Sequence, residues 1–71
     1  MNNTILDENI NILNLSNNIY NILEIHNINT INQLCNKTKT DLKNIGLFRN
    51  QISSIEVALQ LAGQDLKNNR Y

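Results

Sequence analysis

The sequence predicts an all-α fold, a compact bundle of four to five short helices. Three observations support this prediction. Proline is absent and glycine occurs only twice among the 71 residues, so few residues would interrupt a helix. Isoleucine and leucine recur at the spacing of one helix face. No alternation of apolar and polar residues is sustained between hairpin turns, as strands would require.

Composition narrows the class of protein further. Six basic and six acidic residues give a net charge of zero, and asparagine, isoleucine and leucine occur 16, 11 and 10 times. This usage is typical of a gene from an AT-rich genome. The zero net charge excludes a strongly basic nucleic-acid binder of the histone type. One cysteine excludes an internal disulfide, and the length allows one small domain without an enzyme pocket between two lobes.

The chain is expected to divide into three parts. Residues 1–14 form an N-terminal arm or a short helix over the core, residues 15–67 form the helical domain, and residues 68–71 form a polar tail. No apolar run reaches the roughly 18 residues that a transmembrane helix needs. The acidic N-terminus also lacks the basic and apolar regions of a signal peptide.

The first helix is predicted at residues 17–26. Ser16 is a favourable N-cap residue. After it, Ile19, Ile22 and Leu23 follow at intervals of three and four residues and therefore lie on one helix face.

Two short helices are predicted at residues 31–36 and 39–44. Thr30 is expected to cap the first of them. Thr38 and Asp41 form a variant capping box for the second, with aspartate in place of the usual glutamate or glutamine.

The last helix is predicted at residues 49–62, after a tight turn in which Gly46 takes a positive φ. Gly63 ends this helix, and Leu66 is expected to fold back onto the core. The apolar face of the helix is expected to contain Ile52, Ile55, Val57, Ala58, Leu59 and Ala62.

A short helix, a glycine turn and a longer helix make up a helix-hairpin-helix layout, in which backbone N–H groups can bind a phosphate. The segments Leu15-Ser16 with Tyr20-Asn21, Ile28-x-Thr30-Ile31, Thr38-x-x-Asp41-Leu42 and the last helix with Gly63 and Leu66 follow one another at characteristic spacings. In this order they resemble the C-terminal domain of the bacterial-type RNA polymerase alpha subunit over about residues 13–67.

The resemblance implies an alpha C-terminal-domain-like fold related to helix-hairpin-helix domains, and a function in transcription. In that family the domain binds AT-rich promoter DNA in the minor groove and contacts activators and sigma factor. The family's DNA surface combines an arginine on the first main helix, an asparagine three residues later, and a Gly-x-Lys-Ser segment before the last helix.

The family's DNA-contacting residues are only partly retained here. Asn18 occupies the position of the minor-groove arginine, and the asparagine is retained as Asn21. The Gly-x-Lys-Ser segment is about one residue shorter, so that Arg49 or Asn50 stands near the family's lysine, and Lys43 flanks the same turn. The predicted nucleic-acid-binding residues are therefore Asn18, Asn21, Lys43, Arg49 and Asn50.

Other residues, of types that often act in catalysis or binding, are expected to have structural roles here. His26 is expected to interact with the dipole at the end of the first helix, and Cys35 to be a small buried hydrophobe. Phe48 is expected to fill the core between the hairpin helices, with an exposed anchor for a partner as the alternative. No arrangement of nucleophile, base or metal ligands is present, so we predict no enzyme activity, metal or cofactor.

Three functions are compatible with these observations. The first is a transcription module that binds AT-rich double-stranded DNA weakly and contacts RNA polymerase, sigma or a transcription regulator. The second is a protein-interaction domain, a free-standing regulator or decoy, that kept the fold but lost the DNA-contacting arginine. The third is a sterile-alpha-motif-like or other helix-hairpin-helix repair fragment. We expect a monomeric domain in the bacterial cytoplasm or the stroma of a plastid-type organelle, without membrane association.

Overall fold

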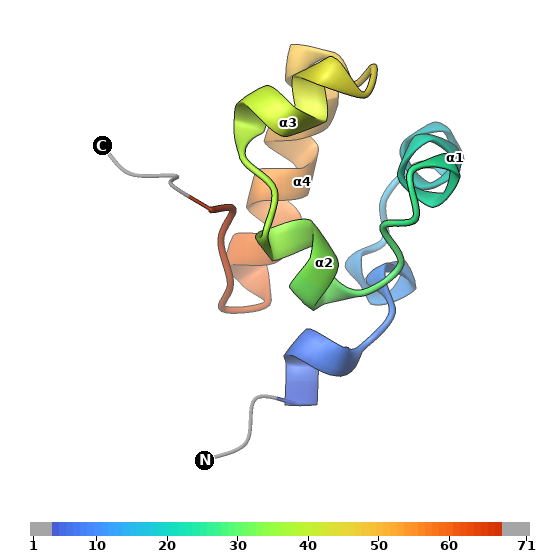
Figure 1. The fold of residues 1–71 in the computed structure, drawn as a ribbon. Coiled ribbons are helices and arrows are strands. Elements are labelled where there is room, and N and C mark those ends of the chain that lie inside the picture. The colour runs from blue at the N-terminus through green and yellow to red at the C-terminus, as the bar shows by residue number, and fades with distance from the viewer. Residues whose placement is uncertain (1–3, 68–71) are drawn as a thin grey trace.

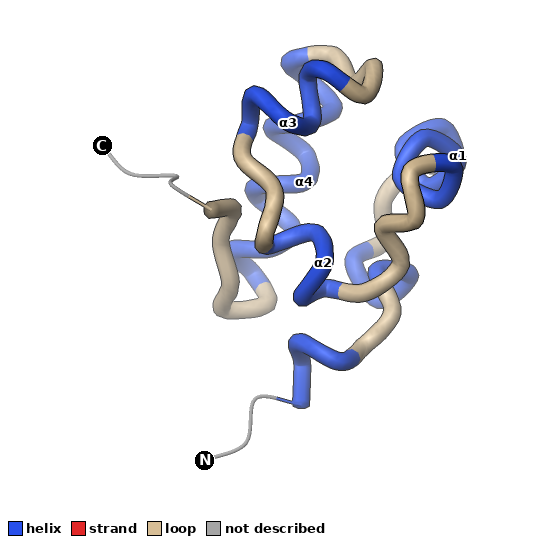
Figure 2. Tube along the Cα trace, in the orientation of Figure 1, coloured by secondary structure: helices blue, strands red, loops and turns tan. Residues whose placement is uncertain are grey.

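The structure is a computed structural model and describes residues 4–67. Six helices follow one another along these residues. Two 3-10 helices precede four α-helices, and the segments between them are turns and loops without a strand in these residues (Figures 1 and 2). The helices are η1 (Thr4–Asp7), η2 (Ile10–Leu13), α1 (Asn17–Ile25), α2 (Ile31–Cys35), α3 (Lys39–Asn44) and α4 (Arg49–Leu61). The all-α prediction is confirmed, and the predicted helix limits differ from the observed ones by at most one residue.

Capping boxes begin the two shortest α-helices. At α2, Thr30 Oγ1 accepts a hydrogen bond from the Gln33 N–H at 3.2 Å, and Gln33 Oε1 accepts from the Thr30 N–H at 3.1 Å. At α3, Thr38 and Asp41 make the same reciprocal pair, at 3.0 Å each. Helices of five and six residues are not stable alone, so these local bonds fix where each one begins.

Schellman turns end α1, α3 and α4. After α3, Gly46 has a φ of 112°, and the Leu47 N–H donates to the Leu42 carbonyl at 3.2 Å. After α1 the left-handed position belongs to Asn27, with a φ of 60°, and the Ile28 N–H donates to the Leu23 carbonyl at 2.9 Å. These two turns direct the next apolar residue back into the core, because Leu47 and Ile28 are both 2% exposed.

Residues 4–14 pack onto the domain and are hydrogen-bonded to it. The Ile10 N–H donates to the Asn29 carbonyl at 3.0 Å, and the Ile31 N–H donates to the Glu8 carbonyl at 2.9 Å. These bonds form a single antiparallel bridge between the N-terminal segment and the link from α1 to α2. The side chains of Ile10 and Leu13 are buried, so the segment supplies part of the core.

Tyr20 joins the same segment to α1 through its side chain. Its hydroxyl accepts from the Leu15 N–H at 2.8 Å and lies 3.2 Å from the Ile10 carbonyl, to which it donates. The ring is half-buried against the core. One side chain therefore satisfies two backbone groups on the approach to α1.

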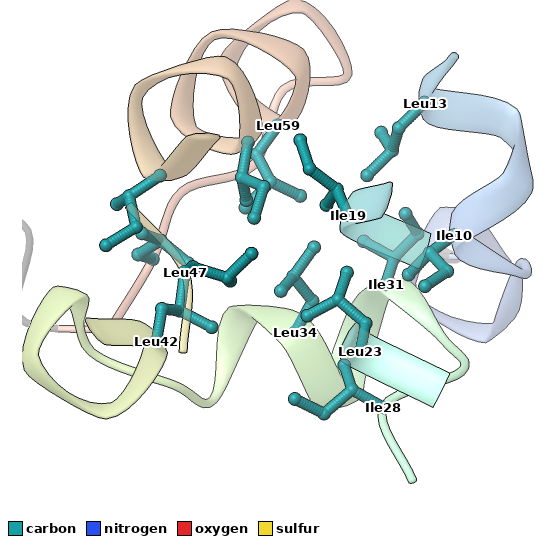
Figure 3. Close-up of a cluster of buried hydrophobic side chains, with 13 residues drawn as sticks. Ile10, Leu13, Ile19, Leu23, Ile28, Ile31, Leu34, Leu42, Leu47 and Leu59 are labelled. Atoms are coloured by element: carbon teal, nitrogen blue, oxygen red, sulfur yellow. The ribbon is translucent and has the colours of Figure 1, made fainter. Parts of the chain in front are cut away.

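The core consists of aliphatic side chains only. In Figure 3 they point toward one another from η2, from all four α-helices and from the loops between them. No polar or charged residue is buried within residues 5–67. The buried residues are Ile10, Leu13, Ile19, Leu23, Ile28, Ile31, Leu34, Leu42, Leu47, Ile52, Ile55, Leu59 and Leu66.

Two predicted core positions are wrong. Phe48 is 72% exposed, because its backbone is extended at the start of α4 and the preceding Leu47 takes the buried position. Val57 is 55% exposed, since it follows Ile55 by two residues and so lies on nearly the opposite side of α4. The predicted return of Leu66 to the core is confirmed, with 3% exposure.

Replacing Tyr20 with phenylalanine tests how the N-terminal segment is held. Tyr20→Phe keeps the packed ring but leaves the Leu15 N–H and the Ile10 carbonyl without this partner. We expect a loss of about 1–2 kcal/mol in the free energy of unfolding, measured by urea denaturation. An unchanged midpoint would show that the hydroxyl bridge does not stabilise the segment.

Candidate nucleic-acid interface

The first turn of α4 borders two surface hollows of different character. One is lined by basic side chains from α3 and the start of α4. The other is a groove between α4 and the segment that leads into α1, and no charged side chain lines it. Arg49 borders the first hollow, whereas Asn50 and Gln51 border the second.

Three cations surround the basic hollow, which has a volume of about 480 Å³. Lys39 and Lys43 are four residues apart on α3 and therefore share one face of that helix. The Schellman turn at Gly46 then places Arg49, the first residue of α4, beside them, and Thr40 completes the lining. The concentration of positive charge favours an anionic group such as a phosphate.

An ion pair reduces part of this positive charge. Lys39 Nζ lies 3.1 Å from Glu56 Oε2, with the two side chains 45% and 15% exposed. The contact joins α3 to α4, and because its Lys39 end is exposed it is worth about 1 kcal/mol. Lys43 and Arg49 are therefore the cations of the hollow that carry most of its attraction for an anion.

The uncharged groove follows the length of α4 and has a volume of about 790 Å³. Its α4 side begins with amide and hydroxyl side chains and ends with apolar ones. The lining residues are Leu13, Asn14, Leu15, Ser16, Ile19, Asn50, Gln51, Ser53, Ser54, Val57, Ala58 and Leu61.

The N-terminal ends of α1 and α4 meet at this groove, and neither has a capping side chain. Ser16 is the N-cap residue of α1, as predicted, but its hydroxyl makes no capping hydrogen bond. At α4 the N-cap position holds Phe48, whose side chain has no acceptor, although Gln51 Oε1 accepts from the Phe48 N–H at 2.8 Å. First-turn N–H groups without capping side chains, together with the helix dipole, attract anions.

The five predicted nucleic-acid-binding residues are all exposed, but they do not form one cluster. Lys43 and Arg49 line the basic hollow, and Asn50 lines the groove. Asn18 and Asn21 lie on α1 and border neither hollow. Lys39 was not predicted from the sequence, although its four-residue spacing from Lys43 was a readable signal.

Charge is distributed unevenly along the neutral sequence. All six basic residues follow residue 36, whereas Asp7, Glu8 and Glu24 precede it. The α1 helix, which carries Asn18 and Asn21, has no cation, and Glu24 lies near its end. The positive charge of the described structure is thus concentrated on α3, on α4 and on the segments next to them.

Other reactive residue types contribute no further site. Cys35 is half-buried, and burial raises the pKa of its thiol, which lowers the fraction of reactive thiolate. Within residues 4–67, no group of histidine, cysteine and acidic side chains could hold a metal ion. None of the helices described is long and apolar enough to cross a membrane.

Comparison with known protein families gives a match over most of the chain. Residues 1–61 match the family described as the C-terminal domain of the alpha chain of bacterial RNA polymerase. A search of curated protein sequences finds no match. The family match confirms the resemblance that the sequence motifs indicated, and it agrees with the compact all-helical fold. Because this family is a non-catalytic domain of a polymerase subunit, the expectation that the protein is not an enzyme is also confirmed.

Acid titration tests the capping box that begins α3, the helix that carries two of the basic residues. The Thr38 N–H, which donates to the Asp41 carboxylate, lowers the pKa of Asp41 below its ordinary value of 3.8, and Lys37 and Lys67 act in the same direction. The folded state therefore gains stability from ionised Asp41 above that value and loses it as the pH falls through the lowered pKa. Asp41→Asn should be less stable than the wild type near neutral pH.

This difference in melting temperature between the wild type and Asp41→Asn should shrink on acidification from about pH 6 to about pH 2. Thermal unfolding followed by circular dichroism measures it. The same difference at both pH values would contradict the assigned role of the carboxylate.

Proposed function

The protein belongs to the family of the C-terminal domain of the bacterial RNA polymerase alpha subunit, and on that premise we propose that it binds AT-rich double-stranded DNA weakly, mainly through α3 and the start of α4. Membership of the family implies a transcription-related interaction with DNA and polymerase. We further propose contacts with RNA polymerase, sigma or a transcription regulator, and a location in the bacterial cytoplasm or a plastid stroma.

The observation that carries the DNA proposal is the position of the start of α4. This single turn lies between the hollow that contains Lys43 and Arg49 and the groove where the uncapped end of α1 lies. A DNA backbone at this turn would meet positive side chains on one side and free N–H groups on the other. Both features are the ordinary means of binding phosphate.

Asn18 and Asn21 are proposed to reach the minor groove from α1. They are three residues apart on an exposed face of that helix, so both can approach the same ligand. Asparagine amides can donate hydrogen bonds to the adenine N3 and thymine O2 acceptors of the minor groove. An amide gains little from the strong negative potential of a narrow A-tract groove, whereas an arginine gains much.

The affinity that follows from these contacts is low. Lys43 and Arg49 would neutralise about two phosphates, which gives a slope of about −2 in a plot of log binding constant against log salt concentration. Binding should therefore be measurable at low salt and nearly lost at physiological salt.

A second candidate function, a protein-interaction domain without DNA binding, is favoured by two observations. Asn18 stands where the resemblance places the family's arginine, and the first 36 residues contain no lysine or arginine. Phe48, 72% exposed beside Arg49, would then anchor a partner protein. This function predicts no response to an A-tract duplex even at high micromolar protein and low salt.

A pair of double variants tests which cations bind DNA. Lys43→Ala/Arg49→Ala removes two charges from the basic hollow, and Lys37→Ala/Lys67→Ala removes two charges where the α2–α3 link meets the segment after α4. Fluorescence anisotropy with an A-tract duplex should show the salt slope falling from about −2 to near zero in the first variant. The second variant should keep most of the wild-type slope.

Equal losses in both double variants would mean that the duplex responds only to net charge. That result would refute a binding site at the basic hollow.

Restoring an arginine on α1 tests the proposed orientation of that helix. Asn18→Arg should strengthen A-tract binding about tenfold, because an arginine in a narrow minor groove gains from its negative potential. Asn17→Arg is the matched control, since it adds the same charge at the neighbouring position, which borders a different surface hollow with Tyr20 and Glu24. Anisotropy titrations that give both variants the same gain would argue against α1 entering the groove.

A further inference from the structure

The position of Phe48 distinguishes it from the other exposed apolar side chains. Five large apolar side chains of the described residues are exposed, and Phe48 is the one aromatic ring among them. It lies in the turn that joins α3 to α4, at one end of the fold (Figure 1). Leu47, directly before it, is buried, and Arg49, directly after it, lines the basic hollow. The exposed ring is therefore next to a proposed phosphate contact.

The backbone that carries this ring is fixed on both sides. The Phe48 N–H donates to Gln51 Oε1 at 2.8 Å, and the Phe48 carbonyl accepts from the Ile52 N–H at 2.9 Å. The preceding side chain, Leu47, holds the turn in the core with 2% exposure. A ring with two rotatable bonds on a fixed backbone loses little conformational entropy when it is inserted into a ligand.

The residues that follow Phe48 border both parts of the proposed DNA contact. Arg49 lines the basic hollow together with Lys43, and Asn50 lines the groove where the uncapped end of α1 lies. A duplex whose phosphates are held at these positions passes over the N-cap of α4, which is Phe48. Because the minor groove is only about 6 Å wide, a side chain next to a phosphate contact can reach the bases. The positive charge beside the ring thus favours DNA as the molecule that covers it.

We propose, on the basis of the DNA binding proposed above, that Phe48 is an apolar wedge that enters the minor groove and partly separates two stacked base pairs. Minor-groove binders commonly insert an apolar side chain in this way, and the insertion bends the duplex. Unstacking costs least at flexible pyrimidine–purine steps such as TA, and it costs more in a stiff A-tract. The wedge therefore selects, among AT-rich sequences, those that contain TA steps.

This selectivity is opposite to the one that an arginine in the minor groove would give. An arginine gains most from the narrow groove of an A-tract, where the negative potential is strongest. The α1 helix has no cation, so the protein lacks this preference on the helix that is proposed to approach the groove. The wedge adds a preference for deformable DNA that does not depend on charge.

Two duplexes of the same A·T composition test the proposal, one an A-tract and the other with alternating TA steps. In fluorescence anisotropy at low salt, the wild type should bind the TA duplex about three- to tenfold more tightly. Phe48→Ala should bind both duplexes equally and keep the salt slope of about −2, because an apolar contact releases no counterions. Leu61→Ala is the matched control, since Leu61 is 85% exposed at the other end of α4 and should not affect the preference.

A conservative variant gives a second readout of insertion. Phe48→Trp keeps a large ring and introduces the only tryptophan of the protein. This variant should retain the preference for the TA duplex. Its fluorescence should be quenched on binding, because the inserted indole stacks against a base. Unchanged fluorescence in the bound variant would contradict insertion.

The outcomes separate a failure of the wedge from a failure of the proposed DNA binding. A wild type that binds both duplexes equally would overturn the wedge and leave the DNA binding intact. Equal effects of Phe48→Ala and Leu61→Ala on the preference, or tighter binding to a single strand than to the TA duplex, would also overturn the wedge. A wild type that binds neither duplex would refute the proposed function and the wedge with it. Circular dichroism establishes that the variants are folded.

Discussion

The fold depends on one cluster of buried aliphatic side chains, which holds together helices that are too short to be stable alone. The α2 and α3 helices have five and six residues, far below the length at which an isolated helix persists in water. Leu34 and Leu42, the central apolar residues of these helices, have no exposed surface. Leu23 from α1 and Leu59 from α4 meet them in the same cluster (Figure 3). Because no polar residue is buried in residues 5–67, apolar packing supplies most of the tertiary stabilisation. Hydrogen bonds act mainly at helix ends and where the N-terminal segment meets the domain.

Most of the fold was predictable because local signals mark where the helices begin and end. Thr30 and Thr38 accept hydrogen bonds from N–H groups three residues later, and Gly46 takes a backbone conformation that is unfavourable for other residues. Each of these signals is contained in a few neighbouring residues of the sequence. The exposure of Phe48 and Val57 was not predictable in this way. Whether Leu47 or Phe48 turns inward depends on how the Schellman turn orients the backbone, and apolar type alone does not show which face of α4 meets the core. The packing of residues 4–14 depends on pairing with Asn29 and Ile31, which are distant in sequence.

The candidate site was predictable in its residue types but only partly in its arrangement. Lys43 and Arg49 were expected beside the glycine turn, and both line one hollow. That Lys39 lines the same hollow can be seen only once the relative position of α3 and α4 is known. The family resemblance put its main DNA-contacting residue on α1, where this protein has Asn18 and no cation. The structure has its cations on α3, α4 and the neighbouring segments. An overall charge of zero thus conceals a separation between an acidic first half and a basic second half, and the proposed DNA contact follows the basic half.

We propose that DNA binding is centred on α3 and the start of α4. NMR titration of the isotope-labelled protein with an A-tract duplex at low salt tests this proposal most directly, because every amide reports separately. We expect the largest shift changes between Lys39 and Gln51, with smaller changes from Ser16 to Asn21. No shift changes at high micromolar duplex, or changes confined to residues outside these two segments, would contradict it.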